Sequence, residues 1–427
     1  MKKSLVLAMA MALGVTASAY AANPFSDVPA GHWAYDSISK LAAAGIIEGY
    51  GDDTFRGDRL MTRYEMAQIV AKALAKGANV DKLAAEFADE LDALGVRVAA
   101  LEKKADNVKI TGQVRYSMQH NKYNDANKHW VRNAAGDKQH QVTKGTRTRL
   151  RTRLWFAGKV NDNWTYRARL ENVQEFNNTL KTYLGNTGDE TTKLNYAYLD
   201  GRLGGMNVEA GRTYLWSGDG NVYDDAIDGI KLAYGKNVKL SAYYGKPTGH
   251  NDSWGWVNMD KAYGGEVKFS FAKKANLTVG YDKFDVDGND DGVDIFNANL
   301  YGKFGKNFGL GALYMHTSSD NKNIIAKGAS KNGFVVTADI AGANFNKPGS
   351  WGIQGKYYHA PAGSAVSHTM TSTAAGDWFN EGHKGYSVGA NYTVAKGMMF
   401  GLTWYDLKSR ATDKKDKTLW GEFQLRF

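Results

Sequence analysis

The sequence predicts a mainly β protein: an antiparallel transmembrane β-barrel of about 16 strands, preceded by a small helical module and a coiled-coil stalk. Three observations support this architecture. The chain begins like an exported protein, a heptad repeat follows a compact N-terminal stretch, and short alternating segments fill the last three-quarters of the chain. Alternation of apolar and polar residues is typical of barrel strands, whose lipid-facing and lumen-facing side chains alternate along the chain.

Residues 1–21 have the composition of a secretion signal. Lys2 and Lys3 precede an apolar core at residues 5–15, and Ala19-Tyr20-Ala21 offers a small-x-small cleavage pattern. We interpret this segment as a signal peptide, so that the mature chain begins near Ala22; an uncleaved anchor is the alternative. The chain contains no cysteine, and no later stretch reaches the ~18–20 apolar residues that a transmembrane helix needs.

A compact stretch over residues 22–75 carries five short motifs. They are Phe25-Ser26-Asp27-Val28, His32-Trp33-Ala34-Tyr35, Leu41–Ile47, Gly49–Phe55 and Thr62-Arg63-Tyr64-Glu65. Together these motifs resemble a single S-layer homology module, a cell-wall-binding domain. The sequence departs from the usual module where Tyr64 stands in place of Ala and Asp53 in place of Gly, although Asp tolerates turns better than most residues.

The resemblance implies a wall-ligand groove formed by Trp33, by Gly49, Asp52 and Asp53 of one turn, and by Arg63. Thr62 and Glu65 are expected to cap a helix start. Arg63 has no capping role and is therefore the best candidate for ligand contact. Trp33 fits a core position equally well. The implied ligand is peptidoglycan or a wall-attached polymer; polyamine substituents would suit the two aspartates, which can also serve only to shape the turn.

The segment 80–108 carries a heptad repeat. Val80, Phe87, Leu94, Leu101 and Val108 recur every seven residues, and Ala84, Leu91, Val98 and Ala105 occupy the complementary register. Sustained spacing of this kind predicts a coiled coil of self-associating helices. A homotrimer would supply three modules, the number that S-layer proteins usually carry in one chain. A single amphipathic helix packed on its own domain is the alternative.

The barrel is predicted over residues 109–427, with a first strand near 108–119 and a last near 417–427. In the last strand, Leu419, Phe423 and the terminal Phe427 share one face, which resembles the C-terminal signature of outer-membrane proteins. Short turns and long loops alternate between the strands. Short turns face the periplasm, and a barrel of about sixteen strands leaves an aqueous lumen.

One strand, at residues 146–159, indicates which side chains line the lumen. Its four arginines cannot face lipid, where each would cost roughly 2–4 kcal/mol at mid-depth. We therefore predict a basic pore wall that the next strand extends, formed by Arg147, Arg149, Arg151, Arg153, Arg167 and Arg169. The third long loop, near 217–226, is predicted to fold inward and to oppose this wall with Asp219, Asp224 and Asp225. The alternative leaves these aspartates at the pore mouth.

Module, stalk and barrel together are similar in layout to the porins of the OmpM type, found in diderm relatives of the Firmicutes. This resemblance implies an outer-membrane porin for passive diffusion of small hydrophilic solutes, which also tethers the outer membrane to peptidoglycan. Two other functions stay open. One is a mainly structural tether or surface-array protein with a plugged barrel, and the other is a substrate-specific channel for sugars or anions.

Charge and motifs argue against other classes of protein. Residues 22–108 carry a net charge of −4 and residues 109–427 one of +12, but no nucleic-acid-binding motif accompanies the basic barrel. Its cations suit the lumen or the phosphates of lipopolysaccharide, for example at residues 408–417. No HExxH motif occurs, and the GxSxG match at Gly385–Gly389 falls within a predicted strand and not at a strand-to-helix turn, so neither an enzyme nor a cofactor is expected. The acidic run 285–294 departs from the EF-hand pattern, and we interpret it as a solvated loop.

Overall fold

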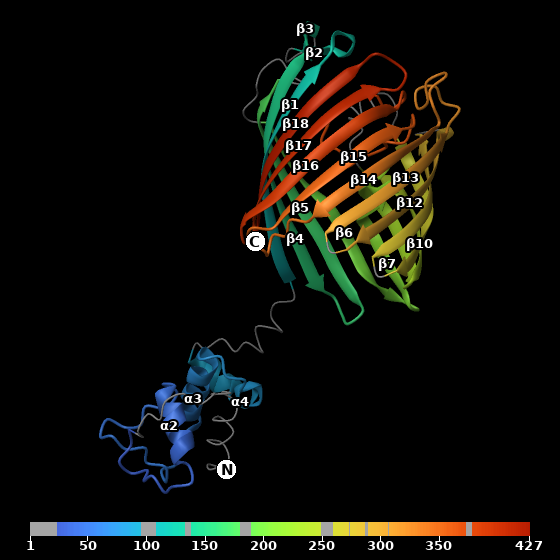
Figure 1. Ribbon diagram of the computed structural model, residues 1–427. Helices are drawn as coiled ribbons and strands as arrows, with labels where there is room; N and C mark the ends of the chain where they lie inside the picture. Colours follow the sequence, from blue (N-terminus) through green and yellow to red (C-terminus); the bar gives the residue numbers. More distant parts are fainter. Residues whose placement is uncertain are drawn as a thin grey trace. The chain divides into compact units, whose positions relative to one another are not determined.

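The computed structural model describes residues 24–94, 108–132, 138–179, 189–248, 259–272, 274–286, 289–305, 307–372 and 378–427. The expected signal peptide lies outside these ranges. The chain divides into two compact units, residues 1–107 and 108–427 (Figure 1). No helix among the described residues is long and apolar enough to cross a membrane.

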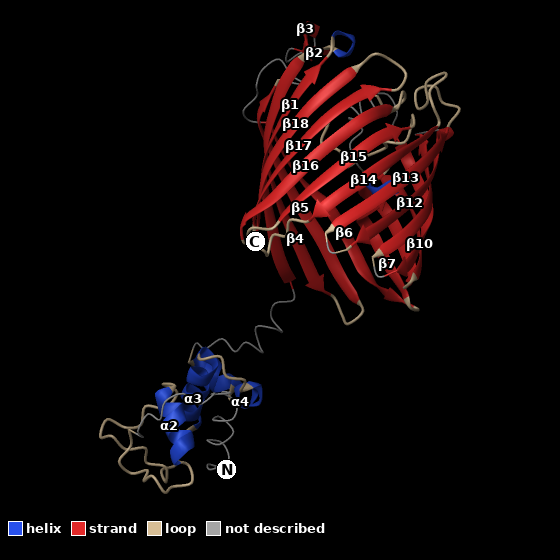
Figure 2. Cartoon of the chain, in the orientation of Figure 1, coloured by secondary structure: helices blue, strands red, loops and turns tan. Residues whose placement is uncertain are grey.

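The first unit is a small helical module (Figure 2). Its described helices are α2 (Tyr35–Ala43), α3 (Arg63–Ala75), α4 (Asp81–Glu86) and α5 (Ala88–Ala93). Its core is formed by apolar side chains between residues 25 and 91, among them Phe25, Ile38, Ile46, Val70 and Leu91. The predicted capping box is confirmed: Thr62 accepts a hydrogen bond from the Glu65 amide, and the Glu65 carboxylate accepts one from the Thr62 amide.

The coiled-coil stalk, predicted over 80–108, is wrong for residues 80–94. The helix is interrupted at Phe87, which separates α4 from α5. The heptad side chains of this part are buried in the module's own core, namely Val80, Ala84, Phe87 and Leu91. They pack beside α3 within one chain, so the alternative of packing on its own domain holds here. The heptad positions between 95 and 107 lie outside the described residues.

The second unit confirms the predicted barrel: sixteen of its described strands close into one antiparallel sheet, in which β1 pairs with both β4 and β18. The strands are β1 (Val108–Tyr123), β4 (Lys144–Lys159), β5 (Trp164–Asn178), β6 (Asp189–Leu203), β7 (Met206–Ser217), β8 (Tyr223–Gly235), β9 (Val238–Pro247), β10 (Met259–Ala272), β11 (Ala275–Val286), β12 (Asn289–Phe304), β13 (Phe308–Ser318), β14 (Asn332–Ala341), β15 (Trp351–Ala360), β16 (His383–Ala395), β17 (Met398–Ser409) and β18 (Lys415–Arg426). A short hairpin, β2 (His129–Arg132) with β3 (Lys138–Val142), lies in the first long loop and was not predicted.

The terminal residue helps to close the barrel. The Gly112 amide donates to the Phe427 carbonyl at 2.7 Å, and the Phe427 amide donates back at 3.1 Å. The Phe427 ring lies over Gly112, since a Cβ atom there would lie 2.2 Å from the ring. The outer wall exposes large apolar side chains such as Leu300, Phe400 and Leu402, the surface that a barrel presents to lipid.

A hydrophobic cluster fills part of the barrel interior. It combines inward-facing side chains of β11, β12 and β13, such as Phe284, Ile295 and Met315, with the loop residues Ile324 and Trp378; all five are fully buried. Loops that follow β13 and β15 therefore fold back into the barrel and cover apolar positions on its inner face. The interior is thus less polar than the alternating pattern predicts.

Candidate functional site

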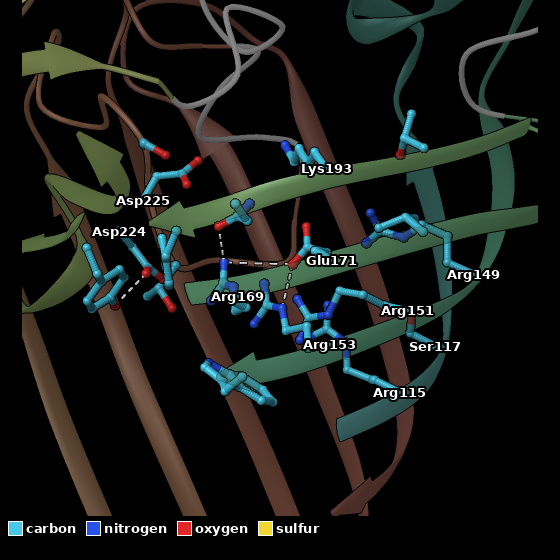
Figure 3. A pocket seen from close by; sticks show the side chains of 18 of the residues that line it. Arg115, Ser117, Arg149, Arg151, Arg153, Arg169, Glu171, Lys193, Asp224 and Asp225 are labelled. Atoms are coloured by element: carbon cyan, nitrogen blue, oxygen red, sulfur yellow. Dashed lines mark hydrogen bonds and ion pairs between the residues drawn. The ribbon is translucent and has the colours of Figure 1, made fainter. Parts of the chain in front are cut away.

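A charged cavity of about 1550 Å³ occupies the part of the lumen that the hydrophobic cluster leaves open. Its walls come mainly from β1, β4, β5 and β6, and from residues 367–372 of the loop that follows β15. Nine Lys or Arg side chains and five Asp or Glu side chains line it, so the cavity is net basic. Figure 3 shows it from close by.

The six arginines predicted to line a pore all border this cavity. Their places follow from strand alternation, since Thr148, Leu150 and Thr152 separate the arginines of β4. The structure adds partners that the sequence could not assign. Arg147 forms an ion pair with Glu175, Arg153 with Glu171, and Arg167 with Asp200; Arg169 bonds Asn195 and lies 3.8 Å from Glu171.

Sequence reasoning missed Arg115, which lies on β1 and borders the same cavity. It shares the inner face of β1 with Gln113, Ser117 and Gln119, all of which are buried. The polar alternation from Gln113 to Gln119 was available in the sequence and could have identified this face. The contribution of Lys193 and of the 367–372 loop to the cavity carries no comparable sequence signal.

Only two of the three aspartates predicted to form an acidic wall border the cavity. Asp224 and Asp225 border the cavity, and Figure 3 places them on the side away from Arg115 and Arg149. They belong to β8, not to the third long loop, which comprises only residues 218–222. Asp219 does not line the cavity: it lies 4.0 Å from Lys356 of β15. The prediction that the three aspartates form one wall therefore does not hold for Asp219.

The third loop does lean into the barrel. Ser217 donates a hydrogen bond to Asp282 at 2.5 Å, and the Tyr223 ring stacks on Phe284 at 5.4 Å. Both partners belong to β11, which is three strands away from β8 in the sheet. The two strand ends that flank the loop are therefore held against the inner wall by a buried hydrogen bond and an aromatic contact.

In the module, the turn predicted to contact the ligand has clear structural roles. Gly49 has φ +67°, and a Cβ atom there would lie 2.3 Å from the Phe25 ring. Asp53 also adopts a positive φ of 57°. Asp52 accepts hydrogen bonds from Thr54, at 2.5 Å, and from Arg56, and these hold the pKa of the Asp52 carboxyl below its usual value. Trp33 is half exposed, at 50%, so it is not a core residue.

Arg63 connects the start of α3 to α4 and α5. Its Nε donates to Glu90 at 2.6 Å, one terminal nitrogen donates to the Glu86 carbonyl at 2.8 Å, and the guanidinium lies 4.9 Å from the Phe87 ring centre. The hydrogen bond from Arg63 holds the pKa of Glu90 below its usual value. A wall ligand that reaches Arg63 must therefore share it with Glu86 and Glu90.

The described residues contain no group of three or more His, Asp or Glu side chains placed to hold a metal ion. In the acidic run, Asp285 lies 3.7 Å from Lys261 and 3.8 Å from Lys283. Residues 287 and 288 of this run lie outside the described residues. Lysine ammonium groups therefore lie beside its first carboxylate.

Comparison with known proteins identifies the N-terminal module. The model of the S-layer homology domain matches residues 24–67. "Outer membrane protein SlpA" of Deinococcus radiodurans is 42% identical over 127 residues, covering 25% of this chain and 11% of that protein. "Outer membrane protein SlpA" of Thermus thermophilus is 40% identical over 126 residues, covering 25% and 14%. The chain thus aligns with only a small part of the length of these relatives.

Among solved structures, a mutant of Rhodopseudomonas blastica porin aligns with 75% of this chain and 100% of its own, at 13% identity and a TM-score of 0.45. The domain match identifies the module, and the relatives are outer-membrane proteins. The chain is an outer-membrane protein that combines a β-barrel with an S-layer homology module.

Proposed function

We propose that this protein is a diffusion porin for small hydrophilic solutes and that its module also tethers the outer membrane to peptidoglycan. The observation that carries the porin half is the 1550 Å³ cavity with charged walls inside a closed barrel. Burying these charges without water or a ligand would cost free energy, so we infer that water fills this part of the lumen. The S-layer homology match at residues 24–67 supports the tether half.

A mainly structural role with a plugged barrel is the second candidate. It is favoured by one observation, the hydrophobic cluster that loop residues such as Ile324 and Trp378 form inside the lumen. Conductance of single proteins in a planar lipid bilayer separates the two. We expect an ohmic conductance from the wild-type protein in KCl. A protein that inserts, as shown by heat-modifiable mobility on a gel, but conducts no ions supports the structural role.

The tether is tested by sedimentation with purified peptidoglycan sacculi. Deletion of residues 23–74 should abolish co-sedimentation and leave the barrel folded. Arg63→Ala should weaken it, but this change also removes the contacts to α4 and α5. Glu90→Gln is the matched control, because it weakens the same contact and leaves the arginine in place. Equal losses for both variants would mean that Arg63 acts through module stability and not through ligand contact.

We also propose a homotrimer, in which any association outside the barrels is confined to the part of the chain between α5 and β1. Each trimer would present three S-layer homology modules to the wall. Aspartates at both Leu94 and Leu101 should then disrupt the association outside the barrels, because a buried charge is disfavoured at a helix seam. The measurement is native mass in mild detergent. A monomeric wild-type protein contradicts the proposal.

Lipopolysaccharide is the proposed lipid partner at the outer rim. Lys384 lies opposite Lys408, and Lys408 opposite Lys415, in one row across β16, β17 and β18. Lys384 shares its face with the exposed Tyr386 and Val388, so the row faces outward, and a pocket of about 380 Å³ lies beside it. Like charges directly opposite each other destabilise a sheet, which an anionic phosphate would relieve. Serine at all three positions should abolish a thermal shift caused by added lipopolysaccharide.

A further inference from the structure

Three arginines of the cavity differ from the others in their partners. Among the described residues, no carboxylate lies within ion-pair distance of Arg149 or Arg151, and Arg115 has only Glu422, at 3.5 Å. Glu422 already accepts hydrogen bonds from Trp420 and Gln424. The buried Nε atoms of Arg115 and Arg151 lack any hydrogen-bond acceptor among the described residues. Arg151 has one acceptor among the described residues, the Gln113 side-chain oxygen at 3.3 Å from a terminal nitrogen. Most N–H donors of the three guanidinium groups therefore have no acceptor among the described residues.

Strand register explains why these three are left over. On the β5 side, Arg153 is opposite Glu171, but Arg151 is opposite Val173. Arg149 is opposite Glu175, whose carboxylate is bonded by Arg147. On the β1 side, Arg115 is opposite Arg151, and Ser117 is opposite Arg149. The two carboxylates of β5 thus pair with Arg147 and Arg153, the first and last arginines of the β4 row. The two arginines between them have no carboxylate partner on β5.

The three guanidinium groups lie together. Opposite residues in an antiparallel pair have Cβ atoms ~4.5–5.5 Å apart, which brings Arg115 and Arg151 side by side on the lumen wall. Arg115 and Arg149 both lie against the Trp420 ring, at 5.3 and 5.6 Å from its centre. Figure 3 shows Arg115, Arg149 and Arg151 on one side of the cavity with Ser117 among them, and Arg169 and Glu171 further along the wall.

Like charges placed opposite each other destabilise a sheet, and unsatisfied buried donors add to that cost. The arrangement is explained if an anion completes it. We propose that Arg115, Arg149 and Arg151 form a binding site for a small polyvalent oxyanion, phosphate or a dicarboxylate, on the solute path. This inference rests on the proposed porin function and names the solute class that the lumen favours.

The geometry favours oxyanions over simple halides. A guanidinium presents a planar fork of N–H donors that matches the paired oxygens of phosphate and carboxylate. The buried Ser117 hydroxyl, opposite Arg149, adds a further donor at the same wall. The flat Trp420 face limits the motion of two of the arginines. A halide can use the positive charge of this site but not its directional hydrogen bonds.

The test is single-channel recording in KCl with added inorganic phosphate, and separately with succinate. We expect both to reduce the chloride current of the wild-type protein at millimolar concentration. Arg149→Ser with Arg151→Ser should raise the half-blocking concentration at least tenfold and shift the reversal potential in a KCl gradient towards cations. The reversal-potential shift should shrink in 1 M salt, where the Debye length is ~3 Å.

Two further variants isolate the site. Arg149→Lys with Arg151→Lys keeps the charge but removes the planar forks, so anion preference should persist while block by phosphate weakens. Arg167→Ser with Asp200→Ser removes an ion pair from the same wall without changing the net charge, and block should stay as in the wild type. Block by phosphate but not succinate assigns the site to phosphate, and the reverse assigns it to dicarboxylates.

Two outcomes overturn the inference. A wild-type channel that conducts ions but is blocked by neither anion rules out the oxyanion site and leaves the porin function standing. Block that the serine variants retain in full places the site elsewhere in the lumen. A folded protein that conducts nothing contradicts the porin function itself, so the two failures are distinguishable.

Discussion

The two sides of the barrel interior differ in how their side chains are satisfied. Around β11 to β15, inward-facing apolar residues such as Phe284 and Met315 are covered by loops and are fully buried. Along β1, β4 and β5, inward-facing arginines border an open cavity. Both sides belong to one closed sheet. The difference teaches that the lumen of a barrel need not be uniform. Loops cover the apolar inward-facing side chains completely, whereas the charged ones border a cavity that loop residues 367–372 only help to line.

The largest loss of stability is expected from a substitution in the hydrophobic cluster inside the barrel. Trp378 is fully buried in the hydrophobic cluster, and Trp378→Ala should destabilise the protein by about 3–5 kcal/mol through lost burial and a residual cavity. Conductance should rise because the covering loop loosens, while ion selectivity stays set by the arginine side. Urea unfolding in detergent and bilayer recording measure both. Trp351→Ala, at a half-exposed position on β15, is the control and should have a smaller effect.

A smaller change should follow from unbalancing the charged side. Glu171 bonds Arg153 and lies 3.8 Å from Arg169. Glu171→Gln leaves these arginines with a weaker acceptor, and we expect a loss of about 1–3 kcal/mol with a reversal potential that moves towards anions. Glu190→Gln removes an exposed carboxylate from the same cavity and should cost less stability. Equal stability losses would show that Glu171 does not hold the arginine row.

Neutralising the aspartates that border the cavity sharpens the comparison further. Asp224→Asn with Asp225→Asn should move the reversal potential towards anions without a large loss of stability. The effect should be clear near 0.1 M salt, where the Debye length is ~10 Å, and small at 1 M. No movement at low salt would place both residues outside the conducting path.

The smallest effect is expected at Asp219, which lies beside Lys356 and does not line the cavity. Asp219→Asn should leave the reversal potential unchanged within error. Recorded under the same conditions as the Asp224 and Asp225 variant, it separates residues that sequence alone would group together. A shift as large as that of the double variant would contradict the division of the lumen described here.

Much of the architecture could be predicted because it depends on local patterns. The two-residue period of barrel strands predicts which face of β4 carries its arginines, and the capping box at Thr62 is a contact across three residues. The stalk was predicted wrongly over residues 80–94 because heptad spacing shows only that a helix has an apolar face. That face finds its partner in the module's own core at Ala84 and Leu91, and spacing carries no information about the partner.

The residues of the cavity could be predicted only in part, for a similar reason. The sequence by itself determined the barrel, the lumen-facing side of β4 and β5, and the module, since these follow from periodicity and short motifs. The tertiary structure decided which arginines have carboxylate partners, because the register between β1, β4 and β5 places Arg151 between Arg115 and Val173. It also decided which part of the lumen stays open, because long loops choose their packing partners across the barrel and not along the chain.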